Sequence, residues 1–74
     1  MMKYKLYLEE HPFEDQLIAE CKTVEDVFKE INKWIDRHNY HSHYIRRWVV
    51  GRDTYIDFGS WRQFFYYREV TENE

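Results

Sequence analysis

The sequence predicts an α+β fold, in which a meandering antiparallel sheet of four to five strands carries one helix on one face, in the order β-β-α-β-β-β. Two patterns support this prediction. One central segment has apolar residues at helical spacing, and the segments on both sides of it alternate apolar and polar residues with the period of a strand. A helix laid across one sheet gives a domain of two layers.

The helix is expected over residues 24–38. Its apolar residues recur three and four positions apart and form one stripe, consisting of Val24, Val27, Phe28, Ile31, Trp34 and Ile35. Thr23 occupies the N-cap position, and Glu25 and Asp26 bring negative charge to the positive end of the helix dipole. We therefore expect the helix to begin directly after Thr23.

Two strands joined by a hairpin turn are expected before the helix. Residues 3–9 alternate apolar and polar side chains, which is typical of a strand with one covered face. The segment that follows contains Pro12 and is typical of a turn. Residues 16–22 can repeat the alternation, and one side of that strand would then carry Leu17, Ala19 and Cys21.

Three strands are expected after the helix, over residues 44–50, 54–58 and 61–70. Turns that contain Gly51 and Gly59 separate them. A single domain would then span residues 1–70, and residues 71–74 would form a frayed acidic tail.

The last of these strands has aromatic residues on both of its faces. Alternation divides its large side chains into two sets, Trp61, Phe65 and Tyr67 against Phe64, Tyr66 and Val70. One helix can bury only one of these sets. The other set is therefore expected either to lie on an exposed sheet face or to be covered by another chain.

Composition and charge favour recognition over catalysis. Aromatic residues make up 20% of the 74 residues, and the formal net charge is -3. Residues 1–37 carry six basic and nine acidic side chains, whereas residues 38–68 carry five arginines and two aspartates. Such a polarised distribution can steer a charged partner, although small domains also show this imbalance by chance.

The surplus aromatic and arginine side chains predict a protein-binding surface, because Trp, Tyr and Arg are enriched at protein interfaces. The candidate partner-binding residues are Arg46, Trp48, Tyr55, Trp61, Arg62 and Tyr67. The partner would be another protein or a second copy of the chain in a homodimer. The alternative is that these side chains simply cover a half-exposed sheet, with arginines stacked on the rings.

A module that binds single-stranded nucleic acid through the same face is the second interpretation. Aromatic platforms beside arginines hold single strands by stacking on the bases. The acidic first half of the chain opposes phosphate binding, so nucleic acid is the less favoured partner. Membrane association is not expected, because no apolar run approaches the length of a span.

A metal-binding histidine loop is the third interpretation. His38, His41 and His43 are close enough in sequence to share a zinc ion, which takes three or four nitrogen or sulfur ligands. The chain has one cysteine and no Cys-x-x-Cys pair, and a polar turn explains the same residues. We therefore expect no cofactor.

Catalytic motifs are not evident, and we expect no enzymatic activity. Cys21 is expected to point from a strand into the core, where a thiol is inert. Ser60 lacks the flanking glycines of a nucleophile elbow, and Asp57 is better placed to cap the turn at Gly59 than to act in a triad. A single cysteine and the lack of a signal-peptide pattern predict a cytoplasmic protein.

Four segments together resemble small uncharacterised accessory proteins of Gram-positive bacteriophages and prophages. They are KLYL at 5–8, TVEDVF at 23–28, YIDFGSW at 55–61 and FFY at 64–66. The resemblance lies in the pattern and implies no site residues. It implies an acidic cytosolic protein of a mobile element, one that binds and blocks a host or defence protein, for which an anti-CRISPR role is one form.

Overall fold

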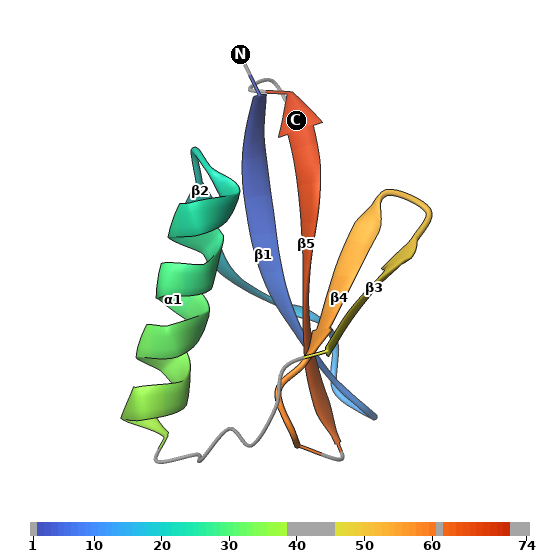
Figure 1. Ribbon diagram of the computed structural model, residues 1–74. Helices are drawn as coiled ribbons and strands as arrows, with labels where there is room; N and C mark the ends of the chain where they lie inside the picture. The colour runs from blue at the N-terminus through green and yellow to red at the C-terminus, as the bar shows by residue number, and fades with distance from the viewer. Residues whose placement is uncertain (1, 39–45, 61, 72–74) are drawn as a thin grey trace.

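The computed structural model describes residues 2–38, 46–60 and 62–71 of the chain. Within these residues, five antiparallel strands form one sheet and one helix packs on it, which confirms the predicted α+β fold (Figure 1). The elements are β1 (Met2–Glu10), β2 (Gln16–Cys21), α1 (Val24–Arg37), β3 (Arg46–Val50), β4 (Asp53–Asp57) and β5 (Gln63–Thr71).

The strands are arranged in the order β2-β1-β5-β4-β3. The β1–β2 hairpin and the β3–β4–β5 meander are therefore two local units, and they are joined by the pairing of β1 with β5. This pairing runs from Met2 opposite Thr71 to Glu10 opposite Gln63. Thr71 thus belongs to the sheet and not to the predicted tail, while residues 72–74 lie outside the described residues.

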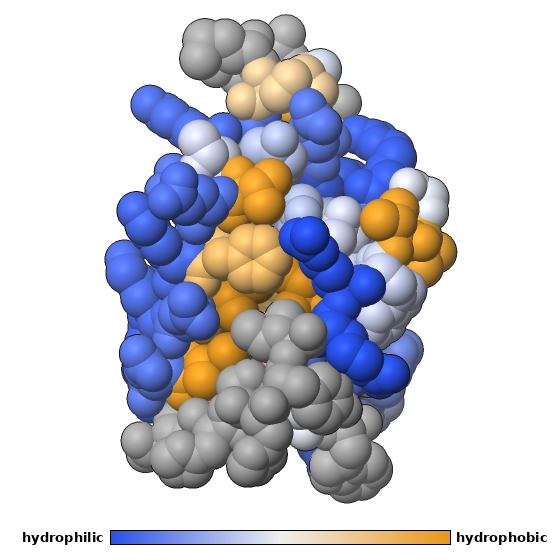
Figure 2. All heavy atoms as spheres, in the orientation of Figure 1, coloured by the Kyte–Doolittle hydropathy of each residue, from blue (hydrophilic) through white to orange (hydrophobic). Residues whose placement is uncertain are grey.

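Helix α1 begins where its sequence predicts. The Thr23 side chain accepts a hydrogen bond from the backbone N–H of Asp26 at 3.1 Å, which confirms Thr23 as the N-cap. The helix ends at Arg37, one residue earlier than expected. Its outer side is hydrophilic, whereas apolar surface lies between the helix and the sheet and over the β3–β4 hairpin (Figure 2).

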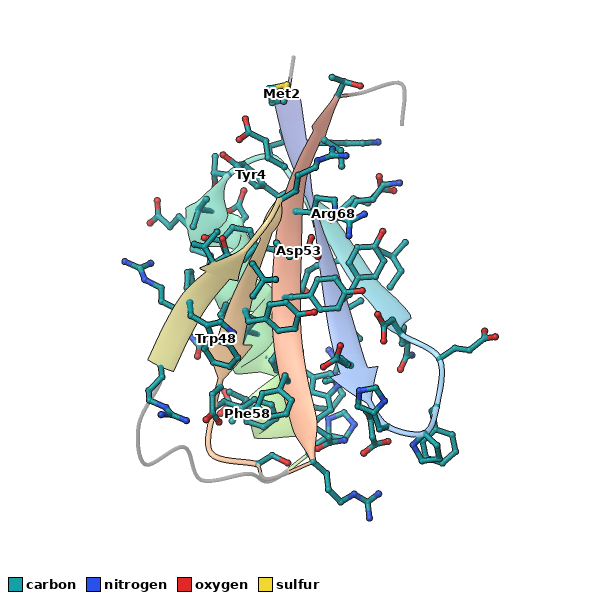
Figure 3. The ribbon with its side chains drawn as sticks, turned by 90° about the vertical axis from the view of Figure 1, so that its right-hand side faces the viewer. Met2, Tyr4, Trp48, Asp53, Phe58 and Arg68 are labelled. Atoms are coloured by element: carbon teal, nitrogen blue, oxygen red, sulfur yellow. The ribbon has the colours of Figure 1, made fainter. Side chains whose placement is uncertain are left out.

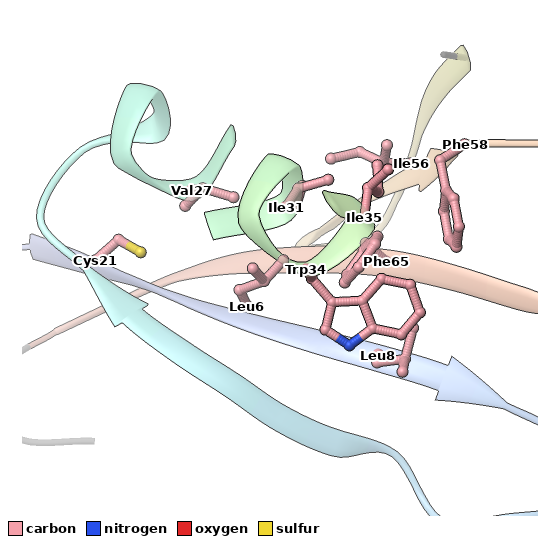
Figure 4. Packing of buried hydrophobic residues seen from close by; sticks show 10 residues of the cluster. All are labelled: Leu6, Leu8, Cys21, Val27, Ile31, Trp34, Ile35, Ile56, Phe58 and Phe65. Atoms are coloured by element: carbon pink, nitrogen blue, oxygen red, sulfur yellow. The ribbon is translucent and has the colours of Figure 1, made fainter. Parts of the chain in front are cut away.

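The core lies between α1 and one face of the sheet (Figure 4). Leu6, Ile56 and Phe65 from three neighbouring strands are fully buried there. The Trp34 ring meets the ring of Phe65 edge to face, with centroids 5.2 Å apart, and contacts Phe58 in the same way. Each such side chain contributes about 1.5–3 kcal/mol on burial, so this one layer supplies most of the stability.

Two glycines make the turns that the sequence predicts. Val50 pairs with Asp53, which leaves a two-residue turn whose first residue, Gly51, has a φ of 61°. Gly59 has a φ of 103°, and its N–H donates to the Asp57 side chain at 2.9 Å. Asp57 is therefore the turn-capping residue that was expected.

Strand β2 departs from the prediction at one residue. Leu6 pairs with Ala19 whereas Tyr7 pairs with Leu17, so Ile18 is an extra residue that forms a bulge. The prediction that Leu17 shares a side with Ala19 and Cys21 is wrong, because the bulge shifts the alternation by one residue. Leu17 follows Tyr7 onto the face away from α1 and is 49% exposed.

Candidate protein-interaction surface

The sheet face opposite α1 carries a row of aromatic side chains. No described helix or strand covers this face, which Figure 3 shows from the front. Tyr7 of β1 pairs with Tyr66 of β5, Tyr66 pairs with Tyr55 of β4, and Tyr55 pairs with Trp48 of β3. We call these four residues the aromatic ladder, because each of four adjacent strands contributes one side chain to it.

The rings of the aromatic ladder are stacked on one another. Successive centroids from Tyr7 to Trp48 lie 5.0, 5.1 and 5.7 Å apart, with interplanar angles of 18°, 29° and 13°. Tyr66 in the middle is 6% exposed, and Trp48 at the edge of the sheet is 40% exposed. Because each ring restrains the next, the side chains are ordered before any partner arrives.

Carboxylates fix the two central tyrosines. The Tyr66 hydroxyl donates to Asp15 Oδ2 at 2.5 Å, and the Tyr55 hydroxyl donates to Glu9 Oε1 at 3.4 Å. The pKa of Tyr66 is raised mainly by burial and further by the nearby Asp15 carboxylate. The pKa of Tyr55 is raised mainly by burial and further by the Glu9 carboxylate. Both phenols therefore keep their protons at neutral pH and hold the ladder in one orientation.

Ion pairs flank the ladder on both sides. On one side, Arg68 lies two residues beyond Tyr66 on β5, and Asp53 lies two residues before Tyr55 on β4. Arg68 donates to both carboxylate oxygens of Asp53, at 2.6 and 3.1 Å. On the other side, Arg46 donates to Asp57 Oδ2 at 2.8 Å. An apolar aromatic centre with a polar rim is the usual anatomy of a protein interface.

The structure brings three of the predicted binding residues, Arg46, Trp48 and Tyr55, together on this face. It places Tyr67 on the opposite face, where its ring meets Tyr4 and Phe28 edge to face at 5.9 and 6.3 Å and packs on the core.

Arg62 lies outside the ladder as well. It is exposed just before β5, with its guanidinium 3.9 Å from a Glu10 carboxylate oxygen. Trp61 lies outside the described residues.

The sequence reasoning missed two members of the ladder and one neighbour. Tyr7 lies between Leu6 and Leu8, so the alternation that buries the leucines also turns Tyr7 to the open face. Tyr66 follows the buried Phe65, so alternation turns Tyr66 to the open face as well. Phe64 adds a further ring on this face, edge to face with Trp48 at 6.1 Å. The alternation was visible in the sequence, but the pairing that joins these strands was not.

The histidine and cysteine candidates have structural explanations where they are described. The His38 Nδ1–H donates to the Trp34 carbonyl oxygen at 2.9 Å, and its ring stacks on the indole of Trp34 at 4.0 Å. His41 and His43 lie outside the described residues. Among residues 2–38, 46–60 and 62–71, no three His, Cys, Asp or Glu side chains are grouped to hold a metal ion. Burial raises the pKa of the Cys21 thiol, which keeps it in its unreactive protonated form.

A groove of about 410 Å³ lies beside the C-terminal end of α1, against β1 and β2. Its lining includes Glu10 and Arg37, which carry opposite charges, and His38. None of its described lining residues is a cysteine or serine that could act as a nucleophile.

Helix α1 is too short and too polar to cross a membrane, and it is the one helix in the described part of the chain. No protein-family model matches the chain, and neither a curated protein nor a solved structure matches it.

Proposed function

We propose that the chain is a non-enzymatic protein-binding module, and that the face bearing the aromatic ladder is its binding surface. The observation that carries the proposal is the ladder itself, a stacked row from four adjacent strands on the face that α1 leaves open. Ordered aromatic side chains bind with little loss of conformational entropy. The flanking Arg–Asp pairs would form the rim.

The stacking supports a protein over a single-stranded nucleic acid as the partner. Bases bind aromatic platforms by stacking on open ring faces. Here the two central rings, Tyr66 and Tyr55, each have a neighbouring ring on both sides, so both of their faces are covered by other rings. A protein surface can pack against ring edges, whereas a base would find few free ring faces.

The charged groups on this face also favour a protein partner over a nucleic acid. The guanidinium groups of Arg46 and Arg68 are bound to aspartates, and the carboxylates of Glu9 and Asp15 lie beside the tyrosine hydroxyls. Phosphate binding draws on several cationic groups, and carboxylates at this position oppose it. A partner with an apolar centre and N–H donors around it would suit the face better.

The narrower expectations stay predictions. That the bound protein is a host or defence component, which binding blocks, is implied by the resemblance to bacteriophage accessory proteins. That binding takes place in the cytoplasm is predicted from the single cysteine and the lack of a signal-peptide pattern. The ladder face would serve such a role, because blocking a protein needs a tight contact surface and no chemistry.

A capture experiment with two matched variants tests the proposal. Wild type, Trp48→Ala and Val49→Thr are immobilised, and proteins are captured from a nuclease-treated lysate of a Gram-positive bacterium. Trp48 lies on the ladder face, and Val49 lies beside it on β3 with its side chain on the other face. Truncating an aromatic hot-spot residue costs about 2 kcal/mol or more, which is about 30-fold in affinity.

We therefore expect at least one protein that wild type and Val49→Thr capture and that Trp48→Ala does not, with circular dichroism unchanged. Equal capture by all three proteins, or no specific capture, would contradict the proposal. A single-stranded oligonucleotide that binds tightly at low salt and is released steeply as salt rises would favour the nucleic-acid interpretation instead.

A further inference from the structure

Among the strands that the structure describes, β3 lies at the edge of the sheet, and it has exposed apolar residues. All five of its residues are exposed, and three consecutive ones, Trp48, Val49 and Val50, are 40%, 70% and 56% exposed. Natural edge strands are usually protected against pairing by charges, proline or a bulge. We propose that β3 pairs antiparallel with β3 of a second copy of this chain, joining two sheets into one. This goes beyond the proposed function, because it uses the edge of the sheet and not its open face.

The hydrogen-bonding phase of β3 fixes which residues can pair across this edge. Val50 and Asp53 flank a two-residue turn, and residues in that position form a hydrogen-bonded pair. Such pairs alternate along an antiparallel ladder, so Trp48 and Arg46 also direct their N–H and C=O groups toward β4. Arg47 and Val49 therefore direct their backbone N–H and C=O groups away from β4, toward the outer edge of the sheet.

One register satisfies these outward groups in both copies. If Arg47 of each copy pairs with Val49 of the other, every outward N–H and C=O group of these residues finds a partner, and the twofold axis passes between the two Trp48 residues. Trp48 then faces Trp48 of the second copy as a non-hydrogen-bonded pair, the type in which side chains come closest. The aromatic ladder would continue across the axis.

The side chains favour the same register. Arg46 would lie opposite Val50 and Arg47 opposite Val49 of the second copy, so no two arginines are directly opposed. If the pairing were centred on Arg47, the two Arg47 side chains would lie opposite each other, and like charges in that position are destabilising. Arg46 is already paired with Asp57, which lowers the net charge brought to the axis.

The size of the contact sets the expected strength. A pairing along five residues buries less than the roughly 800 Å² per partner of a stable complex. We therefore expect a dissociation constant in the micromolar range, about 1 to 100 µM, and a dimer that forms as concentration rises.

Analytical ultracentrifugation of wild type, Val49→Pro and Val49→Thr from about 5 to about 500 µM tests the inference across that affinity range. Val49→Pro removes an N–H that points to the open edge and none that bonds to β4, whereas Val49→Thr keeps the N–H and the side-chain shape. We expect wild type and Val49→Thr to reach twice the monomer mass, and Val49→Pro to stay monomeric. A wild type that stays monomeric, or a Val49→Pro variant that dimerises equally, would overturn the inference.

A cross-linking pair tests the register and does not depend on proline being tolerated. Under mild oxidation, Trp48→Cys should form a disulfide-linked dimer, because facing Cα atoms in such a pair lie about 4.5 Å apart. Arg46→Cys should not, because the two positions 46 would lie about 14 Å apart along the strands. Cys21 is buried and common to both variants. Equal cross-linking of the two variants would refute the register.

The Val49→Pro variant also distinguishes self-association through β3 from partner binding through the aromatic ladder. Val49→Pro leaves the aromatic ladder in place, so it should still capture the partner protein if the face alone binds it. Loss of self-association with retained capture would support both ideas. A partner lost with Trp48→Ala and kept with Val49→Pro, together with a wild type that is monomeric, would support the face and overturn the edge pairing.

Discussion

Replacing Tyr66 with phenylalanine removes one oxygen atom from the centre of the aromatic ladder and leaves the ring in place. The Tyr66 hydroxyl donates to Asp15 at 2.5 Å, and the residue is 6% exposed. A hydrogen bond to a charged acceptor contributes about 1.5–3 kcal/mol, and the lower value applies because water can reach the exposed Asp15. For a domain of this size we expect a melting temperature about 6–12 °C lower.

Urea unfolding followed by circular dichroism measures this cost, and two further variants divide it into its parts. Tyr66→Leu also removes two stacking contacts, which adds about 1–3 kcal/mol to the loss. Tyr55→Phe breaks a longer bond of 3.4 Å to Glu9 and should cost less than about 1 kcal/mol. A Tyr66→Phe variant as stable as wild type, or a larger loss of stability in Tyr55→Phe than in Tyr66→Phe, would contradict the role of the Tyr66–Asp15 hydrogen bond.

The pH dependence supplies an independent check on the same hydroxyl. Its pKa is raised in the folded state, so the folded protein holds this proton more tightly than the unfolded chain does. The associated stability is complete below the unfolded tyrosine pKa of about 10 and is lost as pH rises above that value. Tyr66→Phe lacks the group, so the gap between wild type and variant should narrow above about pH 10. A gap that stays constant into the alkaline range would refute this account.

Three further predictions concern the helix, the core and a turn. Thr23→Ala should lower the free energy of unfolding, measured in urea, by about 1 kcal/mol, whereas Thr23→Ser should keep most of the N-cap stabilisation. Equal losses in the two variants would argue against the N-cap. Cys21 should react with a thiol reagent only as fast as the protein unfolds, and rapid reaction of the folded protein would show that the thiol is accessible. Asp57→Ala should destabilise the protein by about 2 kcal/mol, and more than Asp57→Asn, which can still accept from the Gly59 N–H; the reverse order in thermal unfolding would contradict the turn-capping role.

Elements that depend on neighbouring residues could be predicted from the sequence. The apolar stripe of α1 and the Thr23 cap are local features, and both are where the sequence predicts them. The turns at Gly51 and Gly59 follow from residues that tolerate positive φ. The alternation in the strands likewise identified each of them to within a few residues.

Features that depend on distant pairing could not be predicted. The bulge at Ile18 arises from the register between β1 and β2, which no local pattern encodes. Alternation separates Tyr67 from Tyr66 without saying which of the two faces α1, so the sequence predicts Tyr67 as a binding residue although it packs on the core. The ladder itself needs Tyr7 and Tyr66 side by side, and only the pairing of β1 with β5 brings these residues together. Composition nevertheless identified Trp48, Tyr55 and Arg46 as residues of a common surface.

The pairing of β1 with β5 also governs how the chain reaches this structure. Among the described residues these are the first and the last strands, and they are neighbours along nine residue pairs, from Met2 to Glu10. The β1–β2 and β3–β4 hairpins can form early, but a two-stranded hairpin is marginally stable in water. Their union requires closing a loop of nearly the whole chain, which is slow because its entropy is lost before the contacts form. A ribosome-bound chain therefore cannot complete its core until β5 has emerged, and folding is expected as one cooperative step after that point.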